Sequence, residues 1–433
     1  MRHPQIEQRG IRSLISFKEV PIASRSSFGH ASSSKAKRSA VRVPTPESFF
    51  RYPIKTSKSS GSLVIRHVRI SKNELLRNGF LLMLFQIHLN HSFCSVLLKF
   101  SVQKMIRKAK IIGTGSYLPE RVLTNQDLEQ MVDTSDDWIV SRTGIRERRL
   151  ARFDEYTSTM GVEAARKAIE DANLDAAQID FIIVATLTPD YIFPSTACLI
   201  QNAIGAKNAG AIDVQAACTG YLYALSMARA LIVSGTYKNI LIVASEKLSS
   251  ITDYKDRSTC ILFGDGAAAC VVSSEGHGLS VEALKLGADG EQAELLMLPA
   301  GGCRNPASAD SISSGMHYIK MAGNEVFKHA VRRMESASKD CLESACMKEQ
   351  DVAWIIPHQA NIRILDAMAK RFEHLPQDRV FKTLQKYGNT SASSLGIALD
   401  EWKRAGHGKS GENILLTAFG GGFTWGAALL HHD

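Results

Sequence analysis

The segment from Asp213 to Tyr221 (DVQAACTGY) carries the residue best suited to nucleophilic chemistry, Cys218. Residues 211–216 predict the end of a strand, and residues 219–234 predict a largely apolar, buried helix that ends at Gly235. Cys218 would then cap that helix, where unpaired backbone N–H groups and the helix dipole favour a thiolate. The alternative is a small buried hydrophobic residue, because free cysteine is among the most buried residue types.

A histidine and an asparagine stand at similar junctions later in the chain. An apolar run ends just before His358, and a helix is expected over residues 362–371. This places His358 at the carboxyl end of a strand, where catalytic groups of α/β sheets gather. Asn389 precedes a helix expected over residues 395–404, and its amide can donate a hydrogen bond to an oxyanion. Taken alone, the histidine fits a core or surface position and the asparagine a helix N-cap or a turn.

Three consecutive glycines, Gly420 to Gly422, follow a strand expected over residues 413–418. Because glycine costs backbone entropy, close approach of backbone N–H groups to a ligand oxygen is one reason to place three together. A tight turn in the sheet is the other interpretation. A cysteine, a histidine and an asparagine at strand-to-helix junctions, together with this glycine run, indicate one catalytic site.

Residues 105–433 resemble β-ketoacyl-acyl carrier protein synthase III, the condensing enzyme that initiates type II fatty acid synthesis. The resemblance runs nearly from end to end, through IIGTGSYLPE, DTSDDWIVSRTGIRERR, DVQAACTG, FGDGAAA, MAGNEVF, PHQANIRI, YGNTSASS and AFGGGFTWG. Thr219 departs from the alanine or serine that many members carry after the cysteine.

The resemblance implies a mechanism. Cys218 would take the acetyl group from acetyl-CoA, and malonyl-acyl carrier protein would then lose carbon dioxide. His358 and Asn389 would stabilise the resulting enolate, while the backbone N–H groups of Cys218 and Gly421 would form a second oxyanion site. The products would be acetoacetyl-acyl carrier protein, CoA and carbon dioxide. No metal and no cofactor are implied, since the CoA thioester is a substrate.

The resemblance also implies residues that bind the substrates. Trp138 would stack on the adenine of CoA, with Arg257 on the opposite face and Arg142 nearby, because indole and guanidinium planes stack well on a base. On their own, the tryptophan fits a hydrophobic anchor and each arginine a solvated charge. The pantetheine tunnel would be walled by Asn324, Ala360 and Asn361.

Two further residues are implied to meet other polypeptides. Arg363 would dock the acidic carrier protein, although a lone arginine on a helix is usually just solvated. Phe193 would reach from one subunit of a homodimer into the acyl pocket of its neighbour, although without the resemblance it reads as a core aromatic. Primer length and branching depend on the volume of that pocket, which side chains around Phe193 and Leu262 control.

Internal repeats predict an α/β architecture with two similar halves. Residues 239–244 (NILIVA) recur as residues 413–418 (NILLTA), and residues 180–185 have a similar counterpart in residues 352–356. Apolar runs with little alternation, separated by helical stretches, indicate strands buried on both faces. The resemblance sharpens this to the thiolase fold, a five-layered α-β-α-β-α arrangement of two duplicated halves. The halves are expected over residues 105–275, with the nucleophile, and residues 276–433, with the histidine and the asparagine.

The charge of the chain is divided. Residues 1–104, the basic leader, hold 18 basic and 4 acidic residues, a net charge of +14, whereas residues 105–433 hold 34 and 39, a net charge of −5. The high isoelectric point therefore comes from the leader, and the remainder shows no nucleic-acid-binding motif. Eight scattered cysteines without a C-x-x-C pair indicate a reducing compartment, without disulfides or a zinc site.

Several interpretations of the basic leader are open. Polar residues interrupt its apolar stretch, residues 80–100, which weakens a membrane span, and a secretory signal would stand nearer the start. The preferred interpretation is a start codon assigned too far upstream, because Met105 matches the usual start of the family. The enzyme would then be cytoplasmic. A transit peptide, and hence an organelle matrix, is the alternative, since the leader is rich in arginine and serine and poor in acids.

Other functions share parts of this pattern. Papain-like thiol hydrolases have the same order of Cys, His and Asn, but their C-G-S-C-W signature is missing. An elongating synthase would carry a second histidine in place of Asn389, and a thiolase a second cysteine near the terminal glycines. A polyketide-type condensing enzyme shares the cysteine, the histidine and the asparagine. The motifs FGDGAAA and GGGFTWG, together with Trp138, favour the initiating synthase instead. A carrier-protein scaffold without activity would be expected to lose at least one catalytic group.

Overall fold

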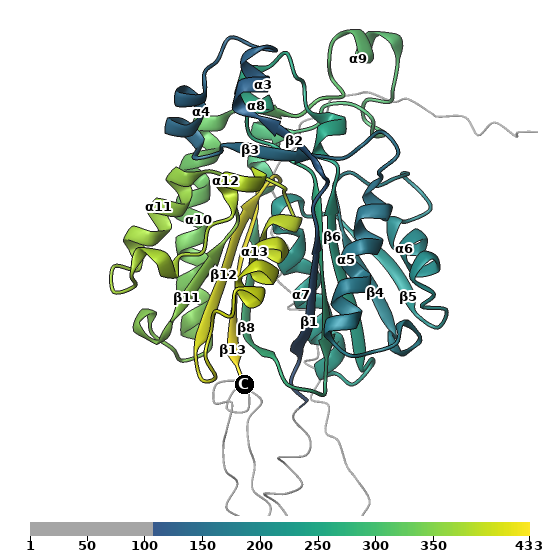
Figure 1. Cartoon of the computed structure of the whole chain (residues 1–433), viewed down its shortest axis with the longest axis vertical. Helices are drawn as coiled ribbons and strands as arrows, with labels where there is room; N and C mark the ends of the chain where they lie inside the picture. Colours follow the sequence, from purple (N-terminus) through teal and green to yellow (C-terminus); the bar gives the residue numbers. More distant parts are fainter. Residues whose placement is uncertain (1–106) are drawn as a thin grey trace, which may run out of the picture. The chain divides into compact units, whose positions relative to one another are not determined.

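The computed structural model describes residues 107–433, which are built around one nine-stranded sheet (Figure 1). In spatial order its strands are β11 (Trp354–Pro357), β12 (Asn413–Gly420), β13 (Thr424–His432), β8 (Leu279–Ala288), β1 (Lys110–Tyr117), β7 (Gly266–Ser273), β6 (Asn239–Glu246), β4 (Phe181–Ala185) and β5 (Gly210–Val214). The sheet is nearly divided in the middle, because β1 pairs with β8 at only two positions, Lys110 with Ser280 and Ile111 with Leu279.

The two parts of the sheet have the same topology. In the first, β4 is parallel to β6, and β6 and β1 are antiparallel to β7, which lies between them. In the second, β11, β12, β13 and β8 repeat these relations in the same order. Strand β5 adds to the edge of β4, and a single parallel bridge from Ile355 to Val380 stands at the matching edge of β11. The predicted repeat of strand sequences thus corresponds to a repeat of strand pairing.

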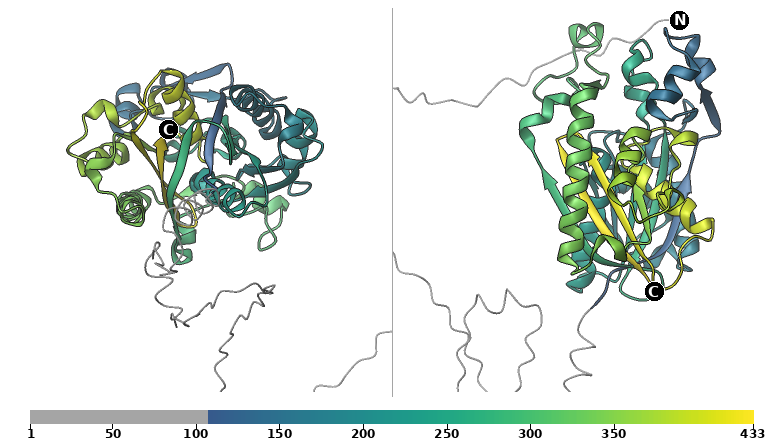
Figure 2. Two further views of the ribbon diagram at one scale, coloured as in Figure 1. Left: turned by 90° about the horizontal axis from the view of Figure 1, so that it is seen from below. Right: turned by 90° about the vertical axis from the view of Figure 1, so that its left-hand side faces the viewer.

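Helices make up three further layers, as Figure 1 shows. They are α5 (Thr157–Asp171) and α6 (Thr196–Ile204) outside the first part of the sheet, α7 (Gly220–Val233) and α13 (Ser393–Arg404) between the two parts, and α10 (Gly323–Ser344) and α11 (Ile362–Arg371) outside the second. The arrangement is the five-layered α-β-α-β-α thiolase fold, and this prediction is confirmed. Seen from below, helices flank the strands on both outer sides (Figure 2, left).

Strands β6 and β12 show why the apolar runs lack polar alternation. In β6, Ile240, Ile242 and Ala244 belong to the hydrophobic cluster that contains α7 and α13, whereas Leu241 and Val243 belong to the cluster beneath α5 and α6. The strand β12 divides its side chains in the same way between the central cluster and the one beneath α10. Both faces of each strand are therefore buried, as expected for sheets covered on both sides.

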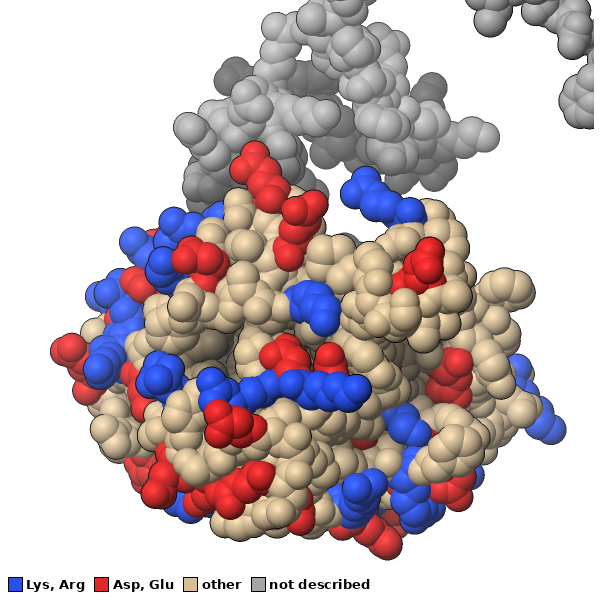
Figure 3. All heavy atoms as spheres, turned by 90° about the horizontal axis from the view of Figure 1, so that it is seen from above, with Lys and Arg blue, Asp and Glu red and all other residues tan. Residues whose placement is uncertain are grey.

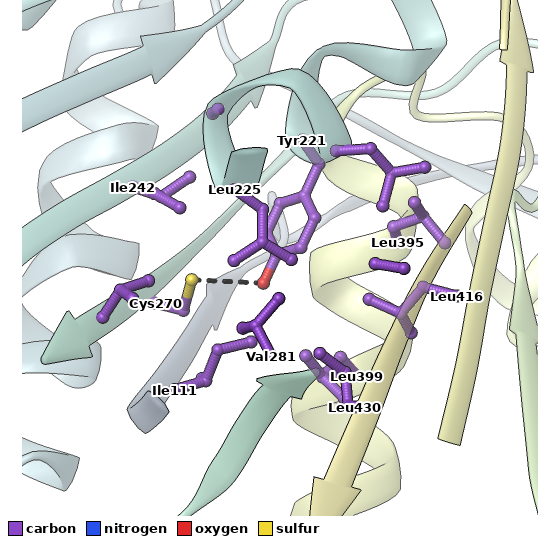
Figure 4. Close-up of a cluster of buried hydrophobic side chains, with 14 of the residues drawn as sticks. Ile111, Tyr221, Leu225, Ile242, Cys270, Val281, Leu395, Leu399, Leu416 and Leu430 are labelled. Atoms are coloured by element: carbon purple, nitrogen blue, oxygen red, sulfur yellow. Dashed lines mark hydrogen bonds between the residues drawn. The ribbon is translucent and has the colours of Figure 1, made fainter. Parts of the chain in front are cut away.

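The central helix α7 joins the two halves of the core. Tyr221 lies in its first turn among apolar side chains from both parts of the sheet, such as Ile242 of β6 and Leu416 of β12 (Figure 4). Its hydroxyl donates a hydrogen bond of 3.2 Å to the sulfur of Cys270, which satisfies the one polar group of this buried side chain.

Small elements lie beyond the carboxyl ends of the parallel strands, at the top of Figure 1 and Figure 2, right. They are β2 (Arg121–Thr124), α3 (Asn125–Glu129), α4 (Asp136–Thr143), β3 (Glu147–Leu150), α8 (Arg257–Cys260), β9 (Leu296–Met297), α9 (Ala309–Ser313), β10 (Lys320–Met321) and α12 (Leu384–Tyr387). Helix α4 is set by its ends: the Ser135 side chain accepts from the Trp138 N–H, and Gly144 closes the helix with a φ of 77°.

The helices and strands expected around the candidate residues are found within a few residues of their predicted bounds. The basic leader, residues 1–104, lies outside the described residues, and the boundary at residue 275 stays a prediction. Within residues 107–433, no helix combines the length and the hydropathy needed to cross a membrane.

Candidate active site

Cys218 lies in a tight turn between β5 and α7. The turn is a short 3-10 helix, Ala217–Thr219, in which Ala217 adopts a left-handed φ of 44°. The N-cap of α7 is Thr219 and not Cys218, so the predicted cap is wrong by one residue. The cysteine is 8% exposed and therefore almost entirely enclosed by protein.

The ionisation of Cys218 differs from the sequence prediction. The pKa of its thiol is raised to about 12, mainly by burial; the Ser391 side chain lowers this pKa, and the charge of Glu246 contributes to raising it. Burial therefore opposes the thiolate that the helix dipole was expected to favour, because desolvation disfavours the charged form of a thiol.

His358 directly follows β11, at the predicted carboxyl end of a strand. Its backbone N–H donates to the Thr417 carbonyl at 2.8 Å, and its side chain is buried. Burial lowers the pKa of His358 to about 3, so its imidazole is neutral at physiological pH.

The tautomer of His358 follows from its partner, Ser394 in α13. The Ser394 Oγ lies 2.6 Å from the histidine Nδ1 and also accepts from the backbone N–H of Gln359 at 3.3 Å. Nδ1 is the acceptor within reach of the serine hydroxyl hydrogen, so the imidazole proton is assigned to Nε2. His358 is thereby a neutral hydrogen-bond donor at Nε2.

Asn389 is fixed by both its backbone and its side chain. Its N–H donates to the Leu262 carbonyl at 2.8 Å, and its carbonyl accepts from Gly264 at 3.1 Å. Its Oδ1 accepts from the Ser391 N–H at 2.9 Å. With the oxygen engaged, the Nδ2 hydrogens are the groups that the side chain can offer to a ligand.

These three residues converge on one cavity of about 100 Å³. Its lining consists of Cys218, Leu262, Phe263, Leu296, Met321, Gly323, Val326, Phe327, Ala330, Met334, His358, Ala360, Asn361, Ile364, Asn389, Phe419 and Gly420. A nucleophile and two hydrogen-bond donors thus face an otherwise mostly apolar space. A larger surface hollow of about 870 Å³, beside α5 and α13, contains none of the predicted site residues.

The glycine run forms the predicted tight turn and also allows a close approach to the nucleophile. It forms the turn between β12 and β13, where Gly420 pairs with Thr424. A Cβ at Gly420 would lie 2.8 Å from the backbone nitrogen of Cys218, so the strand can approach the nucleophile only without a side chain there. The role of the Gly421 N–H stays a prediction, since Gly420 lines the cavity and Gly421 does not.

The predicted adenine site forms a cluster at the exposed end of the molecule. The guanidinium carbons of Arg142 and Arg257 lie 5.2 and 4.8 Å from the centre of the Trp138 ring. Arg257 also donates to the Asp133 carbonyl at 2.8 Å. Charges of both signs are interspersed on the face seen in Figure 3, which includes this end, and no large patch of one sign covers that face.

The other predicted binding residues divide into two groups. Ala360 and Asn361 line the cavity, and the Asn361 side chain caps α11 by accepting from the Arg363 N–H at 2.9 Å. Asn324 is exposed and does not line the cavity, although its neighbour Gly323 does. Arg363 is exposed in the first turn of α11, as a docking residue must be.

Phe193 is 84% exposed, which excludes the core position suggested by its residue type alone. Its neighbours Tyr191 and Ile192 are exposed as well, and so is Ile212 in the edge strand β5. Exposed apolar side chains at a sheet edge are a common feature of surfaces that bind other polypeptides.

The comparisons with known proteins point to one family. A family model described as 3-oxoacyl-[acyl-carrier-protein (ACP)] synthase III matches residues 212–290, and the model of its C-terminal part matches residues 342–432. A β-ketoacyl-[acyl-carrier-protein] synthase III of Chlamydia caviae is 59% identical over 328 residues, which are 76% of this chain and 98% of that protein. The chain belongs to the β-ketoacyl-[acyl-carrier-protein] synthase III family. A synthase III of Caldanaerobacter subterraneus is 50% identical over 74% of this chain and 97% of its own.

Solved structures agree with this synthase III assignment. The 3-oxoacyl-[acyl-carrier-protein] synthase III of Aquifex aeolicus superposes with a TM-score of 0.69 at 49% identity, over 75% of this chain and 99% of its own. The priming β-ketosynthase of the R1128 polyketide pathway gives a TM-score of 0.70 at 36% identity, over 76% and 97%. OleA of Xanthomonas campestris, at 19% identity and a TM-score of 0.65, shares the fold.

Sequence reasoning missed the residues that orient the site of this synthase III. Besides Ser394, the Gln359 side chain donates to the Pro357 and Phe381 carbonyls and accepts from the Thr383 and Leu384 N–H groups. Its four hydrogen bonds fix the backbone beside His358. Both residues lie within quoted motifs, but nothing in their type or spacing distinguishes them from other buried polar side chains.

Proposed function

We propose that this chain condenses acetyl-CoA, or another short acyl-CoA primer, with malonyl-acyl carrier protein by decarboxylative Claisen condensation. The products are acetoacetyl-acyl carrier protein, CoA and carbon dioxide, and the reaction initiates fatty acid synthesis. Membership of the synthase III family makes the protein an acyltransferase of this class. The observation that carries the proposal is the convergence of Cys218, His358 and Asn389 on one cavity.

In the first half-reaction, Cys218 attacks the carbonyl carbon of the acyl-CoA thioester and holds the acyl group while CoA leaves. The burial of the cysteine supports this role, because a cavity closed to water protects the acyl-enzyme from hydrolysis. The backbone N–H groups of Cys218 and Gly421 are our candidates for the donors to the oxyanion of this step.

In the second half-reaction, malonyl-acyl carrier protein loses carbon dioxide and leaves an enolate. His358 Nε2–H and Asn389 Nδ2–H are our candidate donors to the enolate oxygen. The hydrogen bonds that engage the other polar atom of each side chain, at Ser394 and at Ser391, support this assignment. Removal of one such donor typically costs about 2.7 to 4 kcal/mol of transition-state stabilisation. The carbanion then attacks the acylated cysteine.

Substrate recognition is proposed at two surfaces. Trp138, with Arg142 and Arg257, holds the adenine of CoA, and adenine would have to insert between the indole ring and a guanidinium. Asn324, Ala360 and Asn361 guide the pantetheine arm. Arg363 docks the acidic carrier protein from α11. No cofactor takes part, because the CoA thioester is itself a substrate.

We propose that the protein acts as a homodimer in the cytoplasm. The exposed apolar residues near β5 support a dimer whose partner accepts Phe193 into its acyl pocket. An organelle matrix is the alternative location if the basic leader is a transit peptide.

Priming of a polyketide pathway is the second candidate function. It is favoured by the 36% identity to the priming β-ketosynthase of the R1128 pathway. The two functions share the chemistry and differ in primer and carrier. A panel of acetyl, propionyl, branched and longer acyl-CoAs distinguishes them, since preference for a longer primer would favour the polyketide role.

The test is intact-protein mass spectrometry of the full chain with acetyl-CoA, beside Cys218→Ala. We expect an acetyl adduct that maps to Cys218, is missing from the variant, and disappears when malonyl-acyl carrier protein is added and acetoacetyl-carrier forms. Failure of a folded protein to form an adduct with any member of the primer panel would contradict the proposed function.

A further inference from the structure

Arg148, in β3, is a fully buried arginine that the mechanism above does not use. Burying a charged side chain is costly unless an anion pairs with it. The guanidinium instead donates to three neutral oxygens, at 3.2 Å to the Leu123 carbonyl, 2.9 Å to the Asn125 Oδ1 and 2.8 Å to the Ile261 carbonyl. A buried cation whose partners are all neutral calls for an explanation.

The shape of the guanidinium explains the choice of residue. Burial lowers the pKa of Arg148 to about 10, so the group keeps its charge at neutral pH. Its N–H donors form a planar fork that can bond oxygens of separate segments at once. Leu123 belongs to β2, Asn125 to α3, and Ile261 to the loop of residues 261–264, which follows α8. One side chain thus joins three segments.

The loop after α8 connects Arg148 to Asn389. Arg148 donates to the Ile261 carbonyl, and the next carbonyl along the loop, that of Leu262, accepts from the Asn389 N–H at 2.8 Å. The Gly264 N–H donates to the Asn389 carbonyl at 3.1 Å, and the two segments form an isolated parallel bridge there. Asn389 is therefore held on both sides by the loop that Arg148 holds.

Close packing places the same two segments against β3. An ideal Cβ at Gly264 would lie 3.1 Å from the Arg148 Cβ, and one at Gly388 would lie 3.4 Å from it. Gly388 directly precedes Asn389 and has a positive φ of 64°. Because both positions are glycines, the backbone on each side of the bridge can lie directly on Arg148. Arg148 thus contacts the surroundings of Asn389 through packing as well as through hydrogen bonds.

The other side of this hydrogen-bond network reaches α4, the helix of Trp138. The Asn125 amide, whose oxygen accepts from Arg148, donates through Nδ2 to the Asp136 carboxylate at 2.7 Å and to the Ile145 carbonyl at 2.8 Å. Asp136 is the first residue of α4. Arg148 is therefore anchored to the elements that carry the proposed adenine site, while it holds the loop beside the cavity.

We propose that Arg148 positions Asn389 for condensation: by holding the loop of residues 261–264, it keeps the Asn389 Nδ2 within reach of the enolate oxygen. The inference rests on the proposed function, in which Asn389 donates to that oxygen. Arg148 does not line the cavity and touches no reacting atom, so it acts only through Asn389. A displacement of about 1 Å in such a group can cost about 100-fold in rate.

The decisive variant is Arg148→Met, which keeps an unbranched side chain and removes the charge and every hydrogen-bond donor. We expect condensation, measured by carbon dioxide release, to slow by about 10- to 100-fold. Acetyl transfer to Cys218 should change by less than about threefold, because that step does not use the Asn389 donor. Equal losses in the two steps would overturn the proposal.

A double-mutant cycle with Asn389→Ala distinguishes positioning from general damage to the site. Once Asn389 has lost its amide, no donor remains for Arg148 to position. Adding Arg148→Met to Asn389→Ala should therefore slow condensation further by less than about threefold. Two losses that multiply would mean that Arg148 acts independently of Asn389, and the proposal would be wrong.

Arg148→Lys separates the shape of the guanidinium from its charge. Lysine keeps the positive charge but has no planar fork with which to join three segments. Its rate of condensation should lie closer to that of Arg148→Met than to that of the wild type. A rate closer to the wild type would show that the charge alone is needed, which contradicts positioning by the hydrogen bonds.

Hydrogen–deuterium exchange tests the link to Asn389 without any substrate. In Arg148→Met the backbone amides of residues 384–392 should exchange faster than in the wild type, because the loop that accepts from the Asn389 N–H is no longer held. Amides of α10 should keep their wild-type rates and so report that the rest of the protein is intact. Unchanged exchange of residues 384–392, or an equal rise in α10, would refute the link.

Arg229 of α7 offers a matched control. Its guanidinium also donates to two backbone carbonyls, those of Val281 at 2.9 Å and Glu282 at 3.1 Å, but both belong to β8. Arg229→Met should leave condensation and the exchange of residues 384–392 at wild-type values. Losses equal to those of Arg148→Met would mean that the effect is not specific to Arg148.

Two outcomes remain distinct. Thermal unfolding shows whether Arg148→Met folds, and if it does not, Arg148→Lys takes its place in the cycle and in the exchange measurement. If the wild type itself does not condense the substrates, the proposed function fails. The exchange of residues 384–392 then still decides whether Arg148 holds Asn389 in place.

Discussion

The two parts of the sheet share a topology and differ in the chemistry at matching positions. Cys218 stands ahead of α7 in the first part, and Ser391 stands ahead of α13 in the second. Each turn contains a left-handed residue other than glycine, Ala217 with a φ of 44° and Ser391 with a φ of 51°. Strand β6 ends on a buried acid, Glu246, where the matching strand β12 ends on Gly420.

This difference shows how a repeated scaffold supports a two-step reaction. Because α7 and α13 share the central layer, the turns that precede them meet at one cavity. In the proposed mechanism the first part supplies the nucleophile, and the second supplies the neutral donors of His358 and Asn389. Acylation should therefore depend mostly on the first part and decarboxylation mostly on the second, and variants can break these steps apart.

The largest difference between the effects on acetyl transfer and on condensation is expected from His358→Ala and Asn389→Ala. Each removes one donor to the enolate, so condensation should fall by about 100- to 1,000-fold. Acetyl transfer to Cys218 should change by less than about tenfold, within the scatter of ordinary active-site truncations. Adduct formation by mass spectrometry and carbon dioxide release measure the two steps, and the exposed His374→Ala is the control. Equal losses in both steps would contradict the assignment of acylation and decarboxylation to different parts of the sheet.

A smaller loss in the second step is expected from Ser394→Ala. Without the serine donor, the imidazole of His358 can place its proton on Nδ1, and we expect condensation to slow by about 10- to 100-fold. The matched control is the adjacent Ser393→Ala, whose buried hydroxyl donates to the Thr390 carbonyl and does not contact the histidine. Similar activities of the two variants would rule out control of the tautomer by Ser394.

The contact between the two parts is tested by Gly420→Ala. The added Cβ would meet the Cys218 backbone nitrogen at 2.8 Å, so the turn or the strand must move. We expect a loss of about 1 to 3 kcal/mol in the free energy of unfolding, the range for overpacked sites, with slower acylation. Gly290→Ala is the control, since nothing lies within 4 Å of its added Cβ. Urea unfolding compares them, and equal stability would contradict the close packing.

Recognition of the first substrate is tested by Trp138→Ala. Loss of base stacking should raise the KM for acetyl-CoA by about fivefold, equivalent to about 1 kcal/mol, while kcat stays similar. Trp138→Phe keeps an aromatic face and should recover most of the affinity. Steady-state kinetics with each substrate varied in turn provide the measurement. If the KM for malonyl-acyl carrier protein rose instead, Trp138 would act in the second half-reaction, and its role in binding acetyl-CoA would be contradicted.

The smallest effect is expected from Arg363→Glu, which concerns the second substrate. Charge reversal should raise the KM for malonyl-acyl carrier protein by about two- to fivefold at low ionic strength, and the effect should vanish near 1 M salt. Lys370→Glu, a reversal on the same helix α11 in its last turn, is the control. If both reversals act equally, the carrier protein responds to the net charge of the surface and not to Arg363.

The sequence predicted the elements of this fold well, because their signals are local. The apolar runs of β6 and β12 show strands buried on both faces, and helices α7, α11 and α13 were found within about two residues of their expected bounds. The positions of Cys218, His358 and Asn389 at strand-to-helix junctions were also predicted correctly. The convergence of Cys218, His358 and Asn389 was predicted from their junctions and from the family motifs, but their orientation was not.

What the sequence by itself determined is the set of reactive residues and the elements that carry them. The tertiary structure decided how these residues behave. It raised the pKa of Cys218 instead of lowering it, exposed Phe193, and placed Ser394 against His358. The physical reason is that burial and partner choice depend on segments that are distant in the chain. The residues adjacent in sequence determine whether a residue lies in a helix or a strand. Its solvation and its hydrogen bonds depend on the distant segments that pack against it.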